Sequence, residues 1–272
     1  MRAPEDWALA GTTDGSEHFG AHARSAARQA IPRPAHARVI EGPYPELAAA
    51  GPRASPGVGE LRAAFSRAAV DLDADDGGGE FSGAAVLLAL FPGEPSDMFG
   101  EPSDKVEEQL KSPVGASRAG LRALLIRRAD HLRANPGEVA LPGGKAEPDE
   151  TALTAALREA AEEVALAPSQ VEVLGRLQTV RRLSSTQGIV PFVGLVMGRP
   201  RLVASPSEVG AVLVVEISRL LAQGCYWREE WSRIGEVEWT MHFFDLGGDV
   251  VWGATARILY EFLVVLLAPG AS

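Results

Sequence analysis

Cysteine is almost absent from this chain, because Cys225 is the only one among 272 residues. A single cysteine forms no intrachain disulfide and excludes cysteine-rich zinc sites, so neither a disulfide-stapled secreted domain nor a zinc finger is predicted. Long apolar runs are missing too, and none approaches the roughly 18 residues that a membrane-spanning helix needs. No apolar stretch follows Arg2, as it would in a secretory signal. We therefore expect an intracellular protein, cytoplasmic by default, with no membrane association.

The chain also lacks an excess of basic residues. Its formal net charge is -10 and its sequence pI is about 5.1. That charge disfavours non-specific binding to nucleic acid or to an anionic membrane, while a local basic site for a small anion stays possible. Hydrophobic residues make up 46% and charged residues 23%, which is ordinary globular usage. We expect a small-molecule ligand and no nucleic-acid partner, and the sequence leaves the oligomeric state open.

The pattern along the chain separates an N-terminal extension from a folded domain. Residues 1–57 show no sustained period of two or 3.6 residues and are predicted to form a poorly structured extension. The folded domain is predicted over residues 58–268. Its expected strands are 84–91, 121–127, 171–180, 189–197, 209–215 and 239–246, and its expected helices are 152–164, 217–222 and 254–267. Because strands and helices interleave, the predicted fold is α/β, with a mixed sheet covered by helices.

The expected helix at 152–164 carries an unusual group of acidic residues. Glu159, Glu162 and Glu163 are three or four positions apart and share a helix face away from the apolar residues. Like charges at this spacing repel one another, whereas a divalent cation reverses the sign of the interaction. The plain alternative is a solvated acidic face. A Gly143-Gly144 turn before the helix and Arg158 within the cluster favour the cation.

This spacing resembles the motif of the Nudix hydrolases: Gly, five residues, Glu, seven residues, Arg-Glu, an apolar residue, any residue, Glu-Glu, any residue, Gly, and an apolar residue. The matching positions, within a Nudix box at residues 144–166, are Gly144, Glu150, Arg158, Glu159, Ala160, Glu162, Glu163 and Leu166. The departure is Ala165, which stands where the family has Gly. A left-handed alanine there costs on the order of 1 kcal/mol but removes no ligand.

The resemblance implies a Nudix α/β/α sandwich with a mixed sheet, and metal-dependent cleavage of a nucleoside diphosphate linked to another group. The implied ligands for Mg²⁺ or Mn²⁺ are Glu159, Glu163, Glu162 and the carbonyl oxygen of Gly144. Of these, Glu159 and Glu163 are the leading candidates. Arg158 is expected to orient the carboxylates, and Glu150 to support the loop–helix–loop geometry.

The segment before the box resembles the signature of the coenzyme A diphosphatases, a Nudix subfamily. The matching residues are Leu124, Leu125, Arg128, Ala129, Arg133, Gly137, Pro142, Gly143 and Gly144. Ile126 replaces a Thr of the signature, and Leu141 replaces a Phe. The residues that this resemblance assigns to substrate binding are Arg128, Arg133, Gly143 and Gly144.

The same segment places basic side chains in an acidic protein. Arg127, Arg128, His131 and Arg133 suit the 3′-phosphate and the diphosphate of coenzyme A, since guanidinium groups bind phosphate through two parallel hydrogen bonds. The plain alternative is a pair of arginines that form surface ion pairs at the end of a strand.

Past the box, Ser205 to Val209 resembles a loop of the same subfamily. Glu208 in this loop is a candidate ligand or base, or else a solvated carboxylate. His242 is more simply a structural residue. Cys225 has no histidine placed beside it by any motif and is not expected to be a nucleophile.

The predicted activity is hydrolysis of coenzyme A, or of an acyl or oxidised derivative, to 3′,5′-ADP and 4′-phosphopantetheine or its acyl form. The alternatives are a Nudix diphosphatase for ADP-ribose or NADH, and a Nudix nucleotide sensor that does not hydrolyse its ligand.

Overall fold

The computed structural model describes residues 31–34, 37–40, 55–68, 83–93, 106–108, 120–181, 188–232 and 239–268. Most of the predicted N-terminal extension, residues 1–57, lies outside these ranges. The division at 57/58 therefore stays a prediction, although helix α2 begins at Val58, where the folded domain was expected to start.

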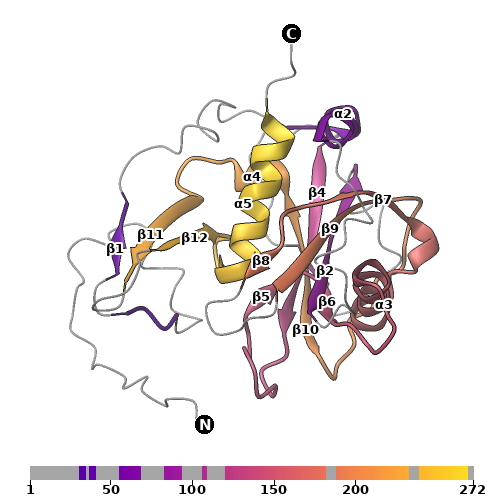
Figure 1. The fold of residues 1–272 in the computed structure, drawn as a ribbon, viewed down its shortest axis with the longest axis horizontal. Helices are drawn as coiled ribbons and strands as arrows, with labels where there is room; N and C mark the ends of the chain where they lie inside the picture. The colour runs from indigo at the N-terminus through magenta and orange to yellow at the C-terminus, as the bar shows by residue number, and fades with distance from the viewer. Residues whose placement is uncertain are drawn as a thin grey trace.

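A mixed sheet with strand order β3-β10-β4-β2-β9-β7 forms the centre of the protein (Figure 1). In that order the strands are Val106–Glu108, Val209–Glu216, Leu121–Arg128, Ala84–Pro92, Gly188–Val196 and Val171–Arg176. The short strands β5 (Val139–Ala140), β6 (Gly143–Lys145) and β8 (Val180–Arg181) pair with β4, β2 and β9. Strand β2 pairs parallel with β9 and antiparallel with β4. Its nearly continuous apolar run suits a strand covered on both faces.

Helices cover both faces of this sheet. Leu121, Ala123 and Leu125 of β4 enter one apolar core, and the alternating Leu124 and Ile126 enter the other. The helices are α2 (Val58–Ala68), α3 (Ala152–Val164), α4 (Ile217–Leu220), α5 (Gly253–Leu267) and the 3-10 turn η4 (Pro168–Gln170). Residues of α2 and α5 pack in the first core and those of α3 in the second, on opposite sides of the sheet (Figure 1). The predicted α/β/α sandwich with a mixed sheet is confirmed.

A second, four-stranded sheet lies beside α5, in the order β1-β11-β12-β13. Its strands are Arg38–Val39, Tyr226–Trp231, Trp239–Asp245 and Val250–Trp252. One face shares the core of α5 through Phe244, and the other buries Trp227, Trp231 and Phe243 together with Ile31. Part of the segment before residue 58 is thus packed against this sheet.

The expected elements agree with the structure where apolar residues dominate. The helix predicted at 152–164 has these bounds, and β2, β4, β9 and β10 differ from the expected strands by one or two residues. The single strand predicted over 171–180 is instead β7 and the beginning of β8, with a break between Arg176 and Val180. The break occurs where the Leu177 N–H donates to the Pro191 carbonyl at 2.8 Å. Strands β1, β11 and β13 were not predicted.

Among the described residues, no helix is long and apolar enough to cross a membrane.

Candidate active site

A loop between β6 and α3 sets the position of the acidic helix. Thr151 caps the helix by accepting a hydrogen bond from the Thr154 N–H at 3.1 Å. At the other end Ala165 adopts a left-handed conformation with φ 58°, and its N–H donates to the Ala161 carbonyl at 3.1 Å. The alanine at this position of the Nudix motif is therefore left-handed, and the turn that follows α3 forms without glycine.

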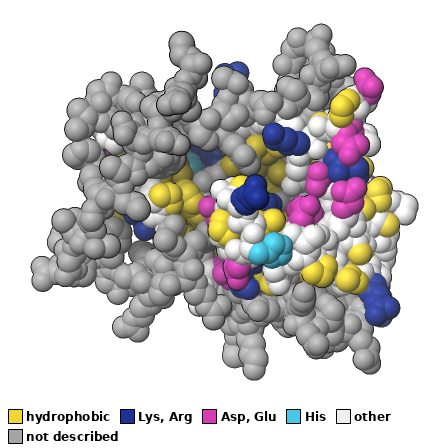
Figure 2. Space-filling view, turned by 90° about the horizontal axis from the view of Figure 1, so that it is seen from below, with side chains coloured by type: hydrophobic (Ala, Val, Ile, Leu, Met, Phe, Trp, Pro, Cys, Tyr) yellow, Lys and Arg dark blue, Asp and Glu magenta, His cyan; other side chains and the backbone are white. Residues whose placement is uncertain are grey.

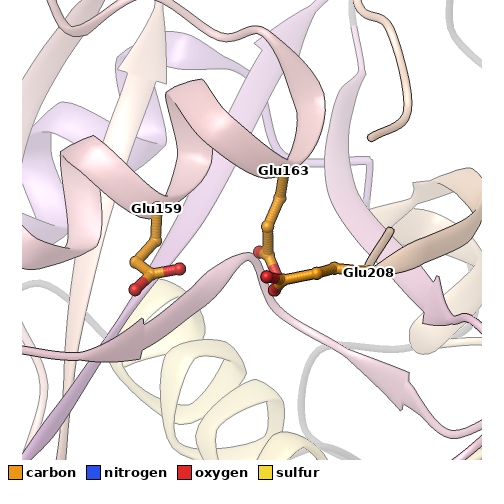
Figure 3. A group of neighbouring side chains, drawn as sticks. All are labelled: Glu159, Glu163 and Glu208. Carbon is orange, nitrogen blue, oxygen red and sulfur yellow. The ribbon is translucent and has the colours of Figure 1, made fainter. Parts of the chain in front are cut away.

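Three carboxylates from two segments meet beside this helix. One carboxylate oxygen each of Glu159, Glu163 and Glu208 lies within 4.8 Å of the others. Glu159 and Glu163 project from successive turns of α3, and Glu208 approaches from the loop before β10 (Figure 3). We call these three side chains the carboxylate group.

Backbone hydrogen bonds tie the Glu208 loop to the end of α3. The Ser205 N–H donates to the Glu163 carbonyl at 2.8 Å, and the Val203 N–H donates to the Val164 carbonyl at 3.0 Å. On the other side, the Glu208 carbonyl accepts from the Ala129 N–H at 2.9 Å, just beyond β4. The position of Glu208 is thus fixed from both α3 and β4.

Glu163 is the most deeply placed member of the group. Glu163 is 2% exposed. Burial raises its pKa to about 7, and the negative charges of Glu159 and Glu208 act in the same direction. Oε2 accepts from the Gly143 N–H at 2.9 Å, whereas Oε1 is buried and has no hydrogen-bond partner among the described residues. Burial also raises the pKa of Glu159. An unsatisfied buried carboxylate oxygen beside two further carboxylates is suited to a cation.

Gly144 leaves the space that Glu159 fills. A Cβ atom at this position would lie 2.4 Å from Glu159 Oε1, far inside van der Waals contact. The preceding Gly143 has φ +151°, and a Cβ there would lie 2.3 Å from the Ala85 carbonyl oxygen. Gly143 is therefore required for β6 to pass beside β2, and a Cβ at position 144 would displace the Glu159 carboxylate from the carboxylate group.

Arg158 holds the loop to the helix. Its Nε and Nη2 donate to the two oxygens of Glu150 at 3.0 and 3.1 Å, and Nη2 also donates to the Lys145 carbonyl at 3.1 Å. Nη1 lies 3.0 Å from Glu159 Oε1 and from Glu162 Oε2. Hydrogen bonding from Arg158 lowers the pKa of Glu150. Arg158 therefore links the supporting Glu150 to the carboxylate group through Glu159.

Known proteins match this part of the chain. The model of the NUDIX domain matches residues 114–230. A protein named uncharacterized Nudix hydrolase NudL, from Enterobacter sp. (strain 638), is 38% identical over 144 residues, which are 51% of this chain and 71% of the relative. A protein of the same name from Yersinia pestis (strain Pestoides F) is 39% identical over 137 residues, 50% of this chain and 68% of the relative. The chain belongs to the Nudix hydrolase family.

Because the chain belongs to this family, we expect the ligands of the site to be a divalent cation and a small nucleotide-type diphosphate.

Among solved structures, a Nudix hydrolase from M. smegmatis, RenU, is 22% identical with a TM-score of 0.38, covering 52% of this chain and 73% of that chain. A MutT/nudix family protein from Enterococcus faecalis is 16% identical with a TM-score of 0.38, covering 83% of this chain and 74% of that chain.

The structure brings together only part of the predicted Nudix ligand set. Glu159 and Glu163 meet as expected, and Glu208 joins them. Glu162 does not join them, because its side chain is 60% exposed and pairs with Arg158 four residues earlier. The Gly144 carbonyl stays a predicted ligand. Sequence spacing placed Glu162 with its neighbours, but successive residues of a helix point about 100° apart, and only Glu163 of this pair turns inward.

The basic residues of the upstream segment have different surroundings. Arg127 forms an ion pair with Asp249, whereas the charge of Arg128 on the opposite face acts on Glu163. His131 and Arg133 are exposed in the turn after β4, and His131 Nε2 lies 3.1 Å from the Ser207 carbonyl. Arg127 thus forms an ion pair, as in the plain alternative, but the pair is largely buried and does not lie at the surface. Asp249 was missed because a lone Asp in a Gly-rich turn carries no motif.

A pH-dependent loss of stability is expected in the metal-free protein. The folded-state pKa of Glu163, about 7, exceeds its ordinary value of 4.5, so the folded state binds more protons between these values. Stability therefore falls as the pH rises through this window, by up to about 3 kcal/mol above pH 7. Urea unfolding in EDTA at pH 5 and pH 8 measures this change.

Glu163→Gln is the matched comparison, because it cannot ionise. The variant is expected to be more stable than the wild type at pH 8, and added Mg²⁺ should stabilise only the wild type strongly. A difference between wild type and variant that is equal at pH 5 and pH 8 would contradict the raised pKa.

Proposed function

We propose that this Nudix hydrolase cleaves the diphosphate of coenzyme A, or of an acyl or oxidised derivative, to 3′,5′-ADP and 4′-phosphopantetheine or its acyl form. The observation that carries the proposal is the place of Arg128, a residue of the coenzyme A signature. Its charge acts on Glu163, and its buried Nε has no hydrogen-bond partner among the described residues. A guanidinium beside the carboxylate group can hold a phosphate that also faces the cation.

The residues present fit a divalent cation. Glu159, Glu163 and Glu208 would hold it through carboxylate oxygens, the ligands preferred by Mg²⁺ and Mn²⁺. When bound, such a cation lowers the pKa of a coordinated water and neutralises phosphate charge. Arg158 keeps Glu159 in place, and Gly143 does the same for Glu163 through its N–H. Glu208, the exposed member, serves as a ligand or as the base that accepts a proton from the attacking water.

The turn after β4 extends the basic surface beyond Arg128. Arg133 and His131 are exposed there, and the contact of His131 with the Ser207 carbonyl brings this turn against the Glu208 loop. Figure 2 shows acidic side chains gathered next to Lys and Arg side chains around a hollowed part of one face. We assign Arg133 to binding the 3′-phosphate of coenzyme A. ADP-ribose and NADH lack this phosphate.

The test is product analysis on purified protein with Mg²⁺ or Mn²⁺, with coenzyme A, ADP-ribose and NADH offered separately. We expect 3′,5′-ADP and phosphopantetheine to form with the highest kcat/KM, identified by mass spectrometry. AMP formed predominantly from ADP-ribose or NADH would keep the Nudix chemistry and overturn the substrate. Binding of a nucleotide at millimolar Mg²⁺ without any product would favour a sensor.

A further inference from the structure

A buried ion pair joins the second sheet to the end of β4. Arg127 Nε donates to Asp249 Oδ1 at 3.0 Å, and Arg127 Nη2 donates to Asp249 Oδ2 at 2.6 Å. The two side chains are 18% and 5% exposed. Asp249 stands in the turn before β13, and its carbonyl accepts from the Leu246 N–H at 2.9 Å. A two-point pair of this kind fixes the direction of the guanidinium as well as its distance.

The end of β4 that Arg127 anchors also builds the carboxylate group. Arg127 and Arg128 are successive strand residues and therefore point to opposite faces of the sheet. Arg128 pairs with Val209, the residue after Glu208, and the Ala129 N–H holds the Glu208 carbonyl. A small shift of this strand end would move Arg128 and Glu208 together.

We propose that the Arg127–Asp249 pair is a positioning device for the active site, acting through Arg128 and Glu208. Buried ion pairs are weak sources of stability, since desolvation offsets much of their attraction, so stability alone is a poor reason for this pair. The pair fixes the strand end from the face opposite the carboxylate group. The inference rests on the proposed function for the role of Arg128 and on the family for the cation.

The chain offers a matched control on the same strand. At the other end of β4, Arg122 Nη2 lies 2.7 Å from Glu216 Oε1, with side chains 3% and 13% exposed. Asp249→Asn changes a buried carboxylate, and Glu216→Gln a largely buried one, to an amide of the same shape. Both are expected to lower the urea midpoint of unfolding, but only Asp249→Asn weakens the pairing that positions Arg128 and Glu208.

The experiment measures Mn²⁺ affinity by electron paramagnetic resonance, together with kcat and KM on the best substrate of the wild type. For Asp249→Asn we expect Mn²⁺ affinity to fall about tenfold and kcat to fall about 10- to 100-fold, the usual range for residues that orient ligands. For Glu216→Gln both quantities should stay within about twofold. Asp249→Glu should recover part of the loss, because it can still accept two hydrogen bonds from Arg127.

A double variant, Arg127→Gln/Asp249→Asn, distinguishes the loss of the ion pair's geometry from the effect of changing the charge near the cation. It leaves the net charge unchanged, so a purely electrostatic effect would return Mn²⁺ affinity to the wild-type value and overturn the proposal. Equal losses in Asp249→Asn and Glu216→Gln would also overturn it. If the wild type prefers ADP-ribose, the coenzyme A assignment fails, while the comparison of variants still tests positioning on that substrate and on Mn²⁺.

Discussion

Glu163→Gln is expected to lower kcat by about 10³-fold or more on the best substrate, equivalent to about 4 kcal/mol of the barrier, while leaving the fold intact. The carboxylate supplies the one buried oxygen of the group that has no hydrogen-bond partner among the described residues. Glutamine keeps an oxygen to accept from Gly143 and removes the negative charge that a cation requires. Steady-state kinetics at saturating Mg²⁺ measure the loss, and circular dichroism checks the fold.

The neighbouring Glu162 also belongs to the motif but points away from the carboxylate group, so its substitution tests whether the direction of the side chain determines the loss of activity. Because its side chain is exposed and paired with Arg158, Glu162→Gln is expected to lose at least tenfold less activity than Glu163→Gln. Equal losses would show that Glu162 turns inward when the cation binds. A Glu163→Gln variant with wild-type rates at saturating Mg²⁺ would remove Glu163 from the ligand set.

Arg33→Ala is expected to destabilise the protein by about 3 kcal/mol. Arg33 Nε donates to both oxygens of Glu229 at 3.0 Å, and Glu229 is 1% exposed. The indole N–H groups of Trp227 and Trp231 donate to the same carboxylate at 3.1 and 2.8 Å. Removal of the Arg33 guanidinium takes away the cation that faces this carboxylate among the described contacts and leaves the two neutral indole donors in place. Urea unfolding at neutral pH measures the change.

A matched ion pair on the same two segments serves as the control. Arg38 pairs with Glu230, but these side chains are 68% and 28% exposed. Arg38→Ala is therefore expected to cost less than about 1 kcal/mol, as exposed pairs do. Similar effects of the two substitutions would contradict the view that burial of Glu229 makes Arg33 important. A large effect of Arg33→Ala alone would show that part of the segment before residue 58 belongs to the folded unit.

The sequence predicted most reliably what local rules control. The helix at 152–164 has its expected bounds because Thr151 caps it and a left-handed residue ends it. Glu159 and Glu163 meet because they are one turn apart. Strand β11 was missed because its buried face carries Glu229 between two tryptophans, which disrupts the apolar alternation. A buried carboxylate is intelligible only once Arg33, 196 residues away, is seen beside it.

The positions of the other site residues depend on contacts between segments that are far apart in the sequence. The spacing of Arg127 and Arg128 suggested one basic cluster, yet the strand turns them to opposite faces and gives Arg127 a partner 122 residues away. For Glu208 the sequence allows a ligand or base as well as a solvated loop carboxylate. Its place in the carboxylate group depends on hydrogen bonds from its loop to α3 and β4, and no local pattern encodes them.

The bonds from the 203–208 loop to the end of α3 have a consequence for how this chain tolerates length changes. The Glu163 and Val164 carbonyls are at the helix end, where no further turn supplies an N–H donor, and they accept hydrogen bonds from the N–H groups of Ser205 and Val203. These two hydrogen bonds therefore fix the number of residues between the end of α3 and Glu208 along the 203–208 loop. One inserted residue between Val203 and Glu208 would shift Glu208 out of register with Glu163.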